Sequence, residues 1–461
     1  MLNSTSLERL AALRKRADAG DYPDVGKRRA GLKRLLRLII GHRRNVIEAL
    51  HEDLGKSEFE SGSTELLPLV TILRYLIRKL PRLAKRRRCG VSWMNFPATG
   101  YITPEPYGLV LVVATWNYPL LLALEPLAGA YAAGNQVVLK LNSRAPRTAG
   151  IIQRLLGEAF GDEITVFDSE CRLSDLLQER FDYIFFTGGA EGGRAILRSA
   201  AENLTPVTLE LGGKSPCIVA PGANLETAAR RIVWGKFTNC GQTCVAPDYL
   251  LVHETLKDQL MVCIRGAIRD FYGEEPLESP DYGHLIDVRA YDRASRLAAS
   301  GRLVVGGNKI PDRLMIEPSV IDQLGPDDPL LNEEIFGPLL PVVTYGTDAE
   351  LLTEVRKNGK PLALYCFGGN GKLRNLLRRR TSSGALVFDD VVTHFINNKM
   401  PFGGVGTSGM GAYHGRRTFD TFVHYKPEMV QSRWLDLPFR YPPFSKLCTA
   451  FLDRLICSKW V

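Results

Sequence analysis

The hydrophobic positions of this 461-residue chain follow two different spacings along its length. In the first eighty or so residues apolar side chains recur every three or four positions, most clearly over 31–54 and again over 66–80. This spacing gathers apolar side chains on one face of an α-helix. We therefore predict that residues 6–85 are mainly helical.

From residue 108 onward, short and fully apolar runs alternate with helical patterns. The strand-like runs are 109–114, 136–140, 164–167 and 183–186, and the predicted helices are 146–160, 173–180 and a segment that opens at the glycine turn 187–193 and ends near 202. Apolar runs of this kind are typical of a parallel sheet with helices on both faces. The pattern predicts a doubly wound α/β domain.

Sheets of this type bind ligands beyond the carboxyl ends of their strands. Asn117, Lys140 and the loop 187–193 all lie at the carboxyl ends of predicted strands and should therefore meet at that edge. A glycine-rich loop that opens a helix offers free N–H groups to a phosphate. Its spacing departs from G-x-G-x-x-G, so a plain tight turn stays open as the alternative.

The second half of the chain, from 211 to about 400, repeats a mixed α/β pattern. Its predicted strands are 217–219, 249–252, 304–305, 339–343, 362–367 and 384–388. Between the helical region and the first strand, residues 86–106 alternate loosely and close with two prolines, which indicates an extended arm or hairpin. The turn 401–411 holds five glycines. So many glycines suggest a backbone that passes through a narrow place, although a flexible loop is the alternative.

The chain is rich in basic residues and has a formal net charge of +9. Such a charge suits contact with nucleotide phosphates, acidic lipid or nucleic acid. Part of the excess is local, in the run 85–88 and the basic residues just before it. A solvated connector face explains that run, and the absence of interleaved aromatic residues argues against nucleic-acid binding.

The nine cysteines are odd in number and scattered along the chain. This usage predicts free thiols in a reducing compartment. Cys240 and Cys244 have no second ligand pair, so we expect no metal site. The first twenty residues carry charges within their apolar pattern, and no uncharged stretch reaches the roughly 20 residues of a membrane span. We expect a cytoplasmic protein that is soluble or at most peripheral to a membrane.

The segment 239–247 holds the most reactive candidates. Cys240 and Cys244 lie in a short loop of Gly, Gln and Thr, and Glu210 stands upstream at the end of an apolar run. A cysteine presented at the junction of a loop and a helix, with a carboxylate as its base, can attack a carbonyl carbon. Cys244 is our candidate nucleophile. The alternative is that both cysteines are small buried residues of the core.

Six blocks of sequence occur in a fixed order, and they read WNYP (116–119), FTG (186–188), LELGGKSP (209–216), GQTCVAPDY (241–249), EIFGP (334–338) and PFGGV (401–405). Together they resemble the signature blocks of the aldehyde dehydrogenase superfamily over roughly residues 20–445. Further stretches resemble its class 3 branch, which includes the fatty aldehyde dehydrogenases, namely APDY (246–249), PLALY (361–365), SGMGAYHG (408–415) and RYPP (440–443).

The resemblance implies an architecture for the whole chain. It divides the sequence into an NAD(P)-binding domain of Rossmann type at 1–85 and 107–210, a catalytic α/β domain at 211–402, and oligomerisation elements at 86–106 and 403–443. Members of the class 3 branch suggest a homodimer. The substrate is expected to be an aldehyde, of medium or long aliphatic chain or aromatic.

The resemblance also implies roles for the candidate residues. Cys244 matches the nucleophile of the family, whereas Cys240 falls at a variable position and is a bystander. The tetrahedral oxyanion would be stabilised by the Asn117 side chain and the backbone N–H of Cys244. Glu210 would activate the water that releases the acid from the thioester, a role that suits a carboxylate with a raised pKa.

A nicotinamide cofactor follows from the same resemblance. Glu334 and Phe336 would contact the nicotinamide ribose, Lys140 and Trp116 the adenosine side, and the glycine loop the pyrophosphate. The remaining residues that the resemblance places at the cofactor are Thr187, Gly188, Gly189, Gly193, Leu211 and Ser143.

Three positions depart from the usual pattern of the family. Gly189 replaces a common Ser, Leu141 a common Pro, and Ser143 a Glu found in NAD-preferring relatives. Because a carboxylate at Ser143 would repel a 2′-phosphate, and Arg144 lies next to it, we predict that both NAD and NADP are used.

The last segment, 444–461, has the apolar spacing of an amphipathic helix. Two interpretations remain open, a helix at a membrane interface and a helix docked on the fold or on a dimer partner. Two alternative functions also remain. One is an NADPH-dependent reductase of acyl thioesters, and the other is a non-catalytic binding or structural protein on this scaffold.

Overall fold

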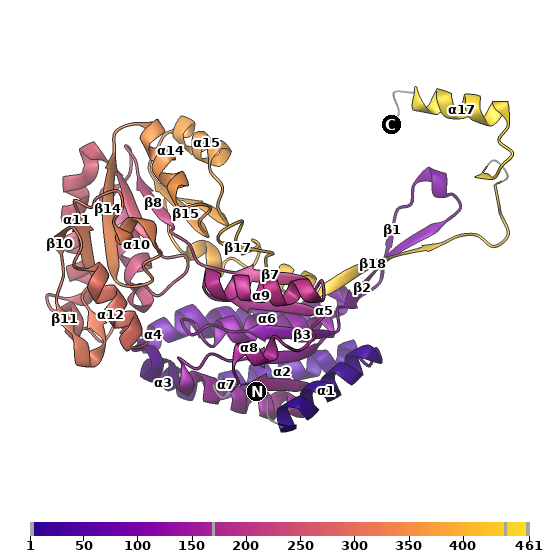
Figure 1. The fold of residues 1–461 in the computed structure, drawn as a ribbon, viewed down its shortest axis with the longest axis horizontal. Helices are drawn as coiled ribbons and strands as arrows, with labels where there is room; N and C mark the ends of the chain where they lie inside the picture. Colours follow the sequence, from indigo (N-terminus) through magenta and orange to yellow (C-terminus); the bar gives the residue numbers. More distant parts are fainter. Residues whose placement is uncertain (1–3, 168–170, 438–439, 458–461) are drawn as a thin grey trace. The chain divides into compact units, whose positions relative to one another are not determined.

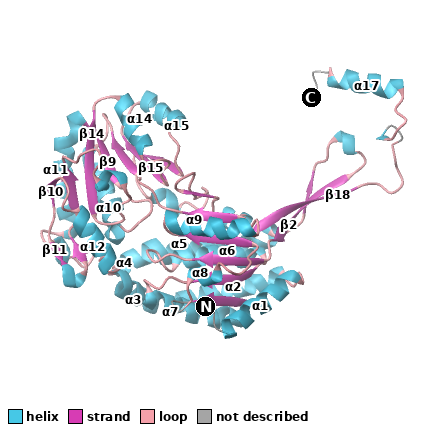
Figure 2. Cartoon of the chain, viewed as in Figure 1, coloured by secondary structure: helices cyan, strands magenta, loops and turns pink. Residues whose placement is uncertain are grey.

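A computed structural model describes residues 4–167, 171–437 and 440–457. The contacts within the chain define two units, one of Met1–Leu83 with Pro106–His424 and one of Ala84–Glu105 with Tyr425–Val461. The first unit contains two large sheets with their helices (Figures 1 and 2). Both are α/β sheets dominated by parallel strands, so the predicted fold class is confirmed.

The first large sheet has the strand order β17-β7-β6-β3-β4-β5. Its strands are β3 (Leu109–Val113), β4 (Gln136–Lys140), β5 (Ile164–Phe167), β6 (Tyr183–Thr187), β7 (Val207–Glu210) and β17 (Gly409–Met410). All neighbours pair in parallel except β17, which runs antiparallel to β7. The chain starts in the middle at β3 and winds outward in both directions, as a doubly wound sheet does.

Helices cover both faces of this sheet. One face packs against α1 (Ser4–Asp18), α8 (Leu173–Leu176) and α9 (Ala190–Glu202) through a shared buried cluster. The crossover helices α6 (Leu121–Ala133) and α7 (Pro146–Phe160) pack on β3, β4 and β5. Every residue of β3 and β4 is buried, which explains why their apolar runs show no alternation with polar residues.

The N-terminal helices differ from the prediction in one respect. Residues 31–54 do not form one helix, because α2 (Val25–Gly41) ends before His42 and α3 (Arg43–Leu54) starts after it. His42 has φ −99° and ψ 18°, and its N–H group closes the first helix on the carbonyl of Leu38. Next come α4 (Glu58–Ser61), a π-helical turn η1 (Gly62–Leu66) and α5 (Leu67–Leu83).

The second large sheet has the order β10-β13-β14-β9-β8-β15-β16. Its strands are β8 (Pro216–Val219), β9 (Tyr249–His253), β10 (Arg302–Val305), β13 (Ser319–Asp322), β14 (Leu339–Tyr345), β15 (Ala363–Phe367) and β16 (Ala385–Phe388). The edge strand β10 is antiparallel to β13, and β13 was not predicted.

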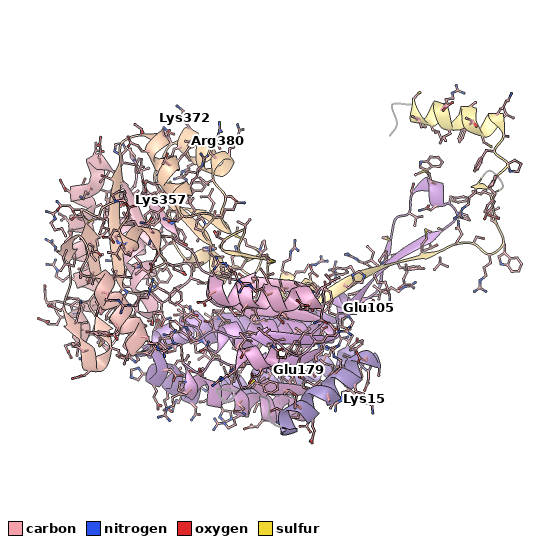
Figure 3. The ribbon with its side chains drawn as sticks, viewed as in Figure 1. Lys15, Glu105, Glu179, Lys357, Lys372 and Arg380 are labelled. Atoms are coloured by element: carbon pink, nitrogen blue, oxygen red, sulfur yellow. The ribbon has the colours of Figure 1, made fainter. Side chains whose placement is uncertain are left out.

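One face of the second sheet is covered by α14 (Asp348–Lys357) and α15 (Gly371–Arg380) through a second buried cluster. Charged side chains such as Lys372 and Arg380 lie on the outside of this layer (Figure 3). The helices α10 (Leu225–Phe237) and α11 (Lys257–Tyr272) pack against each other. The shorter elements of the unit are α12 (Val288–Leu297), α13 (Pro329–Asn332), α16 (Arg417–Asp420), β11 (Lys309–Ile310) and β12 (Met315–Ile316).

The second unit is built on a three-stranded sheet of β1 (Arg87–Cys89), β2 (Thr99–Pro106) and β18 (Val423–Val430). The pairing of β1 with β2 is the hairpin that the sequence indicated. Lys426 Nζ lies 2.6 Å from Glu105 Oε1, and Arg86 Nη2 lies 2.6 Å from Glu428 Oε2. These pairs join β18 to the arm 86–106.

The chain closes with α17 (Lys446–Ile456), which is capped by the side chain of Ser445. None of its residues is buried, and Leu447 and Ile456 are among its most exposed apolar side chains. Within the described residues, no helix combines the length and apolarity that crossing a bilayer requires. Whether α17 docks on the fold, on a dimer partner or on a membrane stays a prediction.

Candidate active site

A cavity of about 370 Å³ lies at the carboxyl edge of the first sheet. Because β3, β6 and β7 are parallel, the residues at their ends meet at this edge. Segments of the second α/β region form the opposite wall. The predicted site residues that line the cavity are Trp116, Asn117, Thr187, Gly188, Gly189, Glu210, Leu211, Cys244, Glu334 and Phe336.

Three predicted cofactor residues lie outside the lining of this cavity. Lys140 is buried at the end of β4, and its Nζ atom donates to the carbonyl of Leu141 over 2.7 Å. Ser143 is exposed in the loop that follows. Gly193 is buried in the first turn of α9, where an added Cβ would lie 3.0 Å from the Leu211 side chain. Gly193 therefore lies where α9 packs closely against the end of the neighbouring strand.

The loop that carries Cys244 has an unusual backbone. Asn239 and Cys240 have φ values of 54° and 53°, and Gly241 follows with 74°. A side chain at Gly241 would place its Cβ 2.2 Å from the carbonyl oxygen of Gly337. Left-handed conformations cost free energy at non-glycine residues and persist only where the surroundings enforce them. The conformation of this loop is therefore imposed by its packing.

The two cysteines of the loop differ in their surroundings. Cys244 is partly exposed and lines the cavity, whereas Cys240 is fully buried, with its Sγ atom 3.6 Å from the hydroxyl of Tyr282. The expected junction of a loop and a following helix is wrong, because α10 and the 3₁₀ turn Thr238–Gly241 precede Cys244 and no helix begins at it. No helix N-terminus therefore supports a thiolate at this position.

Asn117 links the end of β3 to the cysteine loop. Its Nδ2 atom donates to the carbonyl of Gln242 over 3.0 Å, and Asn239 Nδ2 donates to the carbonyl of Asn117 over 2.8 Å. A carboxamide has two N–H donors, so the Asn117 amide keeps one donor beyond its bond to Gln242. Tyr118 and Thr243 add a second link, with 2.5 Å between their hydroxyl oxygens.

Glu210 is the last residue of β7 and is only 3% exposed. Within the described part of the chain, neither carboxylate oxygen has a hydrogen-bond partner. Burial raises the pKa of Glu210 well above its usual value, and the nearby negative charge of Glu125 raises it further. A carboxylate without partners, with a raised pKa and facing a cavity, has the properties of a general base.

Burial also raises the pKa of the Cys244 thiol, to about 12, and the charges of Glu334 and Glu210 contribute. The backbone N–H groups of Cys244 and Val245 act in the opposite direction. At neutral pH the thiol therefore holds its proton. Attack on a carbonyl requires a neighbouring base to accept that proton, and Glu210 lines the same cavity.

Glu334 approaches the backbone of the 209–216 block very closely. A Cβ at Gly212 would lie 2.1 Å from Glu334 Oε1, so a side chain at position 212 would displace this carboxylate from its present place. Burial raises the pKa of Glu334 to about 7, and the charge of Asp248 adds to the effect. The Gly213 N–H group and the charge of Lys214 oppose the rise.

The main chain around Glu334 is held by a buried ion pair. Lys214 Nζ lies 2.6 Å from Asp248 Oδ2, and both side chains are almost fully buried. Lys214 also donates to the carbonyl of Glu333 over 2.8 Å, and both oxygens of Asp248 accept from the Ile335 N–H at 3.2 Å. Three of the six blocks noted in the sequence therefore meet at this pair.

Several residues of the cavity were not predicted from the sequence. Arg144, which the sequence suggested only as a neighbour of Ser143, lines it, with its guanidinium 4.2 Å from the ring of Trp116 and its Nε atom 2.6 Å from Asp287 Oδ2. Much of the remaining wall is apolar or aromatic, with Pro68, Leu122, Trp234, Phe395, Ile396, Phe402 and Tyr413. Isolated aromatic residues give no signal in a single sequence, because core aromatics occur in the same patterns.

The site has the features needed to hold a dinucleotide. The N-terminus of α9 begins at Gly189, which provides no side-chain cap for the helix. An added Cβ at Gly189 would meet nothing within 4 Å, so the space in front of it is open. Free N–H groups at the start of a helix suit a pyrophosphate. The carboxylate of Glu334 in the same cavity suits ribose hydroxyls.

The model of the aldehyde dehydrogenase family matches residues 11–427. The chain belongs to the aldehyde dehydrogenase family. The chain is 40% identical over 425 residues to 4,4'-diaponeurosporen-aldehyde dehydrogenase of Staphylococcus aureus, which covers 91% of this chain and 93% of that protein. It is 39% identical over 419 residues to aldehyde dehydrogenase family 3 member A2 of Rattus norvegicus, covering 90% and 87%.

The fold of this aldehyde dehydrogenase is shared by solved structures. A Staphylococcus aureus AldH in its substrate-bound state superposes with a TM-score of 0.95 at 37% identity, covering 99% of this chain and 100% of that one. The enzyme is therefore an oxidoreductase that oxidises aldehydes with a nicotinamide cofactor. The resemblance to the class 3 branch is confirmed by the family 3 relatives.

Proposed function

We propose that the enzyme oxidises an aldehyde to its carboxylic acid through a thioester on Cys244. The observation that carries this proposal is the single cavity that brings together Cys244, Glu210, Asn117 and Glu334. These residues are far apart in the sequence and belong to different elements. A nucleophile, a base, an oxyanion donor and a ribose ligand together are what the reaction requires.

The first step is the addition of Cys244 to the aldehyde carbonyl. The thiol must lose its proton, and Glu210 accepts it because its raised pKa makes it a stronger base. The carbonyl oxygen becomes an oxyanion in the thiohemiacetal. The amide donor of Asn117 that Gln242 leaves free, with the backbone N–H of Cys244, would stabilise that charge.

The second half of the reaction releases the acid. Glu210 first releases to solvent the proton that it took from Cys244. It then takes a proton from water, and the hydroxide attacks the thioester carbon and expels the Cys244 thiolate. The buried and unpartnered carboxylate supports this role, because a group with no competing hydrogen bond is available to a water molecule. An acyl-thioester reductase has no need of such a base, so the oxidative direction is favoured.

A bound nicotinamide would accept the hydride that leaves the thiohemiacetal carbon. Glu334 and Phe336 would hold the nicotinamide ribose, and Thr187, Gly188, Gly189 and Leu211 line the same cavity. Trp116 and Lys140, with Ser143 beyond them, would contact the adenosine side, while Gly193 keeps α9 close to its strand.

We propose that both NAD and NADP serve as cofactor. Ser143 is exposed and uncharged, so nothing at this position repels a 2′-phosphate. Arg144 is less available than the sequence suggested, because its guanidinium already pairs with Asp287. The proposal therefore rests on the missing carboxylate at Ser143.

The apolar wall of the cavity favours an aldehyde with a medium or long aliphatic chain or an aromatic group.

The arm 86–106 and the segment 403–443 would form a homodimer interface. The exposed apolar side chains of α17 are compatible with contact to a membrane surface or to a partner subunit. We propose the division of the chain into domains at 1–85 with 107–210 and at 211–402 on the same basis.

The experiment is a product analysis with straight-chain and aromatic aldehydes. Each aldehyde is offered with NAD or NADP, and the reduced cofactor and the carboxylic acid are quantified together. Equal amounts of both products support the proposal, with kcat/KM rising with chain length. Formation of aldehyde from an acyl thioester and NADPH, without the forward reaction, would establish the reductase instead. The absence of both reactions would favour a non-catalytic protein.

A further inference from the structure

A buried ion pair lies behind the cavity, in the helical region that the sequence analysis gave no role. Lys56 Nζ is 2.6 Å from Glu65 Oε1, and both side chains are fully shielded from solvent. Two charges removed from water lose their hydration, and such pairs are often no more stable than apolar residues of the same size. Stabilisation of the fold alone therefore does not explain why this buried ion pair is present.

The contacts of the pair converge on one short segment, 117–121. Lys56 Nζ donates to the carbonyl of Asn117 over 3.0 Å and lies 4.0 Å from the ring centre of Tyr118. Glu65 Oε2 accepts from the N–H groups of Leu120 and Leu121, at 2.8 and 3.2 Å. The loop between β3 and α6 is thus held at the carbonyl of Asn117, at the ring of Tyr118 and at the N–H groups of two leucines.

The local helix geometry places Glu65 for this role. Glu65 belongs to the π-helical turn Gly62–Leu66, between α4 and α5. A π-helical turn is wider than an α-helical one and is frequent at functional sites. Ser63 and Thr64 of the same turn line the cavity. One turn therefore supplies part of the cavity wall and the carboxylate that fixes the Asn117 loop.

We propose that Lys56 and Glu65 are positioning residues, which hold the amide of Asn117 in the orientation that stabilises the oxyanion. This inference rests on the proposed function, because Asn117 must be the oxyanion donor. Asn117 O accepts from Lys56 and from Asn239, so the residue is braced from two sides. Without the ammonium group one brace is lost, while the bond from Asn117 Nδ2 to Gln242 remains.

The variant that separates this role from folding is Lys56→Met with Glu65→Gln. A glutamine carbonyl can still accept from Leu120 and Leu121, and methionine fills the space of the lysine chain without leaving an unpaired charge. The variant removes the donor to Asn117, the cation over Tyr118 and the positive charge that faces the buried carboxyl of Glu60. The matched control is Arg14→Met with Asp182→Asn.

The control pair repeats the same chemistry away from the cavity. Asp182 Oδ2 lies 2.7 Å from Arg14 Nη1 and accepts from the N–H of Leu109 at 2.7 Å. Neither residue lines the cavity. Both double variants therefore remove a cation and neutralise a carboxylate that accepts from the backbone, from two N–H groups at Glu65 and from one at Asp182.

The readout is hydrolysis of a p-nitrophenyl ester without cofactor. Attack of Cys244 on the ester builds the same kind of oxyanion, so the assay reports on oxyanion stabilisation without any contribution from the cofactor. Loss of an oxyanion donor costs roughly 100- to 1,000-fold, and a displaced group about 100-fold. We expect Asn117→Ala to lose roughly 100- to 1,000-fold in kcat. Lys56→Met/Glu65→Gln should lose roughly 10- to 100-fold in kcat, with little change in KM.

The decisive comparison is the triple variant with Asn117→Ala. If the pair acts through Asn117, the triple variant hydrolyses the ester at the rate of Asn117→Ala within about twofold, because residues that act as one unit are not additive. Losses that multiply would assign the pair a purely structural role and overturn the inference. The control double variant should keep the wild-type rate.

The possible failures can be told apart. A wild-type rate in Lys56→Met/Glu65→Gln, beside a slow Asn117→Ala, overturns the positioning role and leaves the proposed function intact. A wild-type rate in Asn117→Ala removes the oxyanion role on which both depend. If the double variant does not fold, Lys56→Gln keeps a neutral donor for Asn117. A rate between those of Asn117→Ala and the wild type supports the inference. A rate below that of Asn117→Ala would overturn it, because a pair that acts through Asn117 cannot cost more than the loss of that residue.

Discussion

The carboxylate of Glu125 forms a buried hydrogen bond with His414, with 2.8 Å between Glu125 Oε1 and His414 Nδ1. Thr418 donates to the same carboxylate oxygen over 2.9 Å. Glu125 acts on the active site through its charge. Burial raises the pKa of Glu210, and the negative charge of Glu125 raises it further. A residue of α6 thereby influences the base at the end of β7.

This relationship predicts the pH dependence of hydrolysis. Glu210 works as a base only when deprotonated, and its pKa lies well above that of an ordinary glutamate. The rate should therefore fall as the pH drops through this raised pKa. Glu125→Gln removes the like charge, lowers the pKa of Glu210 and moves the acid limb of the kcat profile to lower pH.

The groups that face this region are His414, Tyr413 and Glu210, and none of them is changed by the substitution. The measurement is kcat for aldehyde oxidation across a pH series. The control is Glu278→Gln, which neutralises an exposed glutamate that pairs with Arg313. An acid limb that stays in place, or moves to higher pH, would contradict the coupling of Glu125 to Glu210.

The Lys214–Asp248 pair predicts a second effect, on cofactor binding. Lys214→Met removes the donor to Glu333 O and leaves Asp248 with Lys236, whose Nζ is 3.8 Å away. Because Glu334 is proposed to hold the nicotinamide ribose, loosening its backbone should weaken cofactor binding by about tenfold, or about 1.4 kcal/mol. The KM for aldehyde should change less.

Cofactor dissociation constants measured by fluorescence titration test this expectation. Arg302→Met is the matched control, because Arg302 pairs with the buried Asp322 at 2.9 Å in the same region of the chain, and neither residue lines the cavity. Unchanged cofactor affinity in Lys214→Met would show that the pair has no part in placing Glu334.

Cofactor preference gives a third prediction, centred on Ser143. The wild type should use NAD and NADP with kcat/KM values that differ by less than about a hundredfold, or roughly 2.7 kcal/mol. Ser143→Glu should shift the ratio toward NAD by at least about tenfold, because the carboxylate would repel a 2′-phosphate. Ser143→Gln, of similar size but uncharged, is the control. A strict NAD preference in the wild type would refute dual use.

Much of the nucleotide-side architecture could be predicted from the sequence. The predicted bounds of β4, β5 and α7 agree with the structure, because fully buried parallel strands and an amphipathic helix give uninterrupted patterns. The placement of Asn117 and the loop 187–193 at one edge followed from the rule for parallel strands. The resemblance to a family then distinguished Cys244 from Cys240, which pattern alone could not do.

Other features depend on contacts that a single sequence does not display. The strand β13 (Ser319–Asp322) is short and includes polar residues, so the sequence does not predict it. Lys56 and Glu65 lie in a charged helical segment whose pattern suits a solvated face. Glu65 lies in the wide turn at Gly62–Leu66 and Lys56 just after the end of α3, and a helix of ordinary periodicity would not predict the burial of either side chain. The break at His42 likewise leaves no mark in the apolar spacing.

Formation of reduced cofactor by Cys244→Ser, measured beside Cys240→Ser, tests the central claim most directly. Cys240 is buried against Tyr282 and should tolerate a hydroxyl, so this variant should keep most of the wild-type kcat. Cys244→Ser should lose about a thousandfold or more, because the thioester can no longer form. Full activity in Cys244→Ser, or activity lost only in Cys240→Ser, would contradict the account.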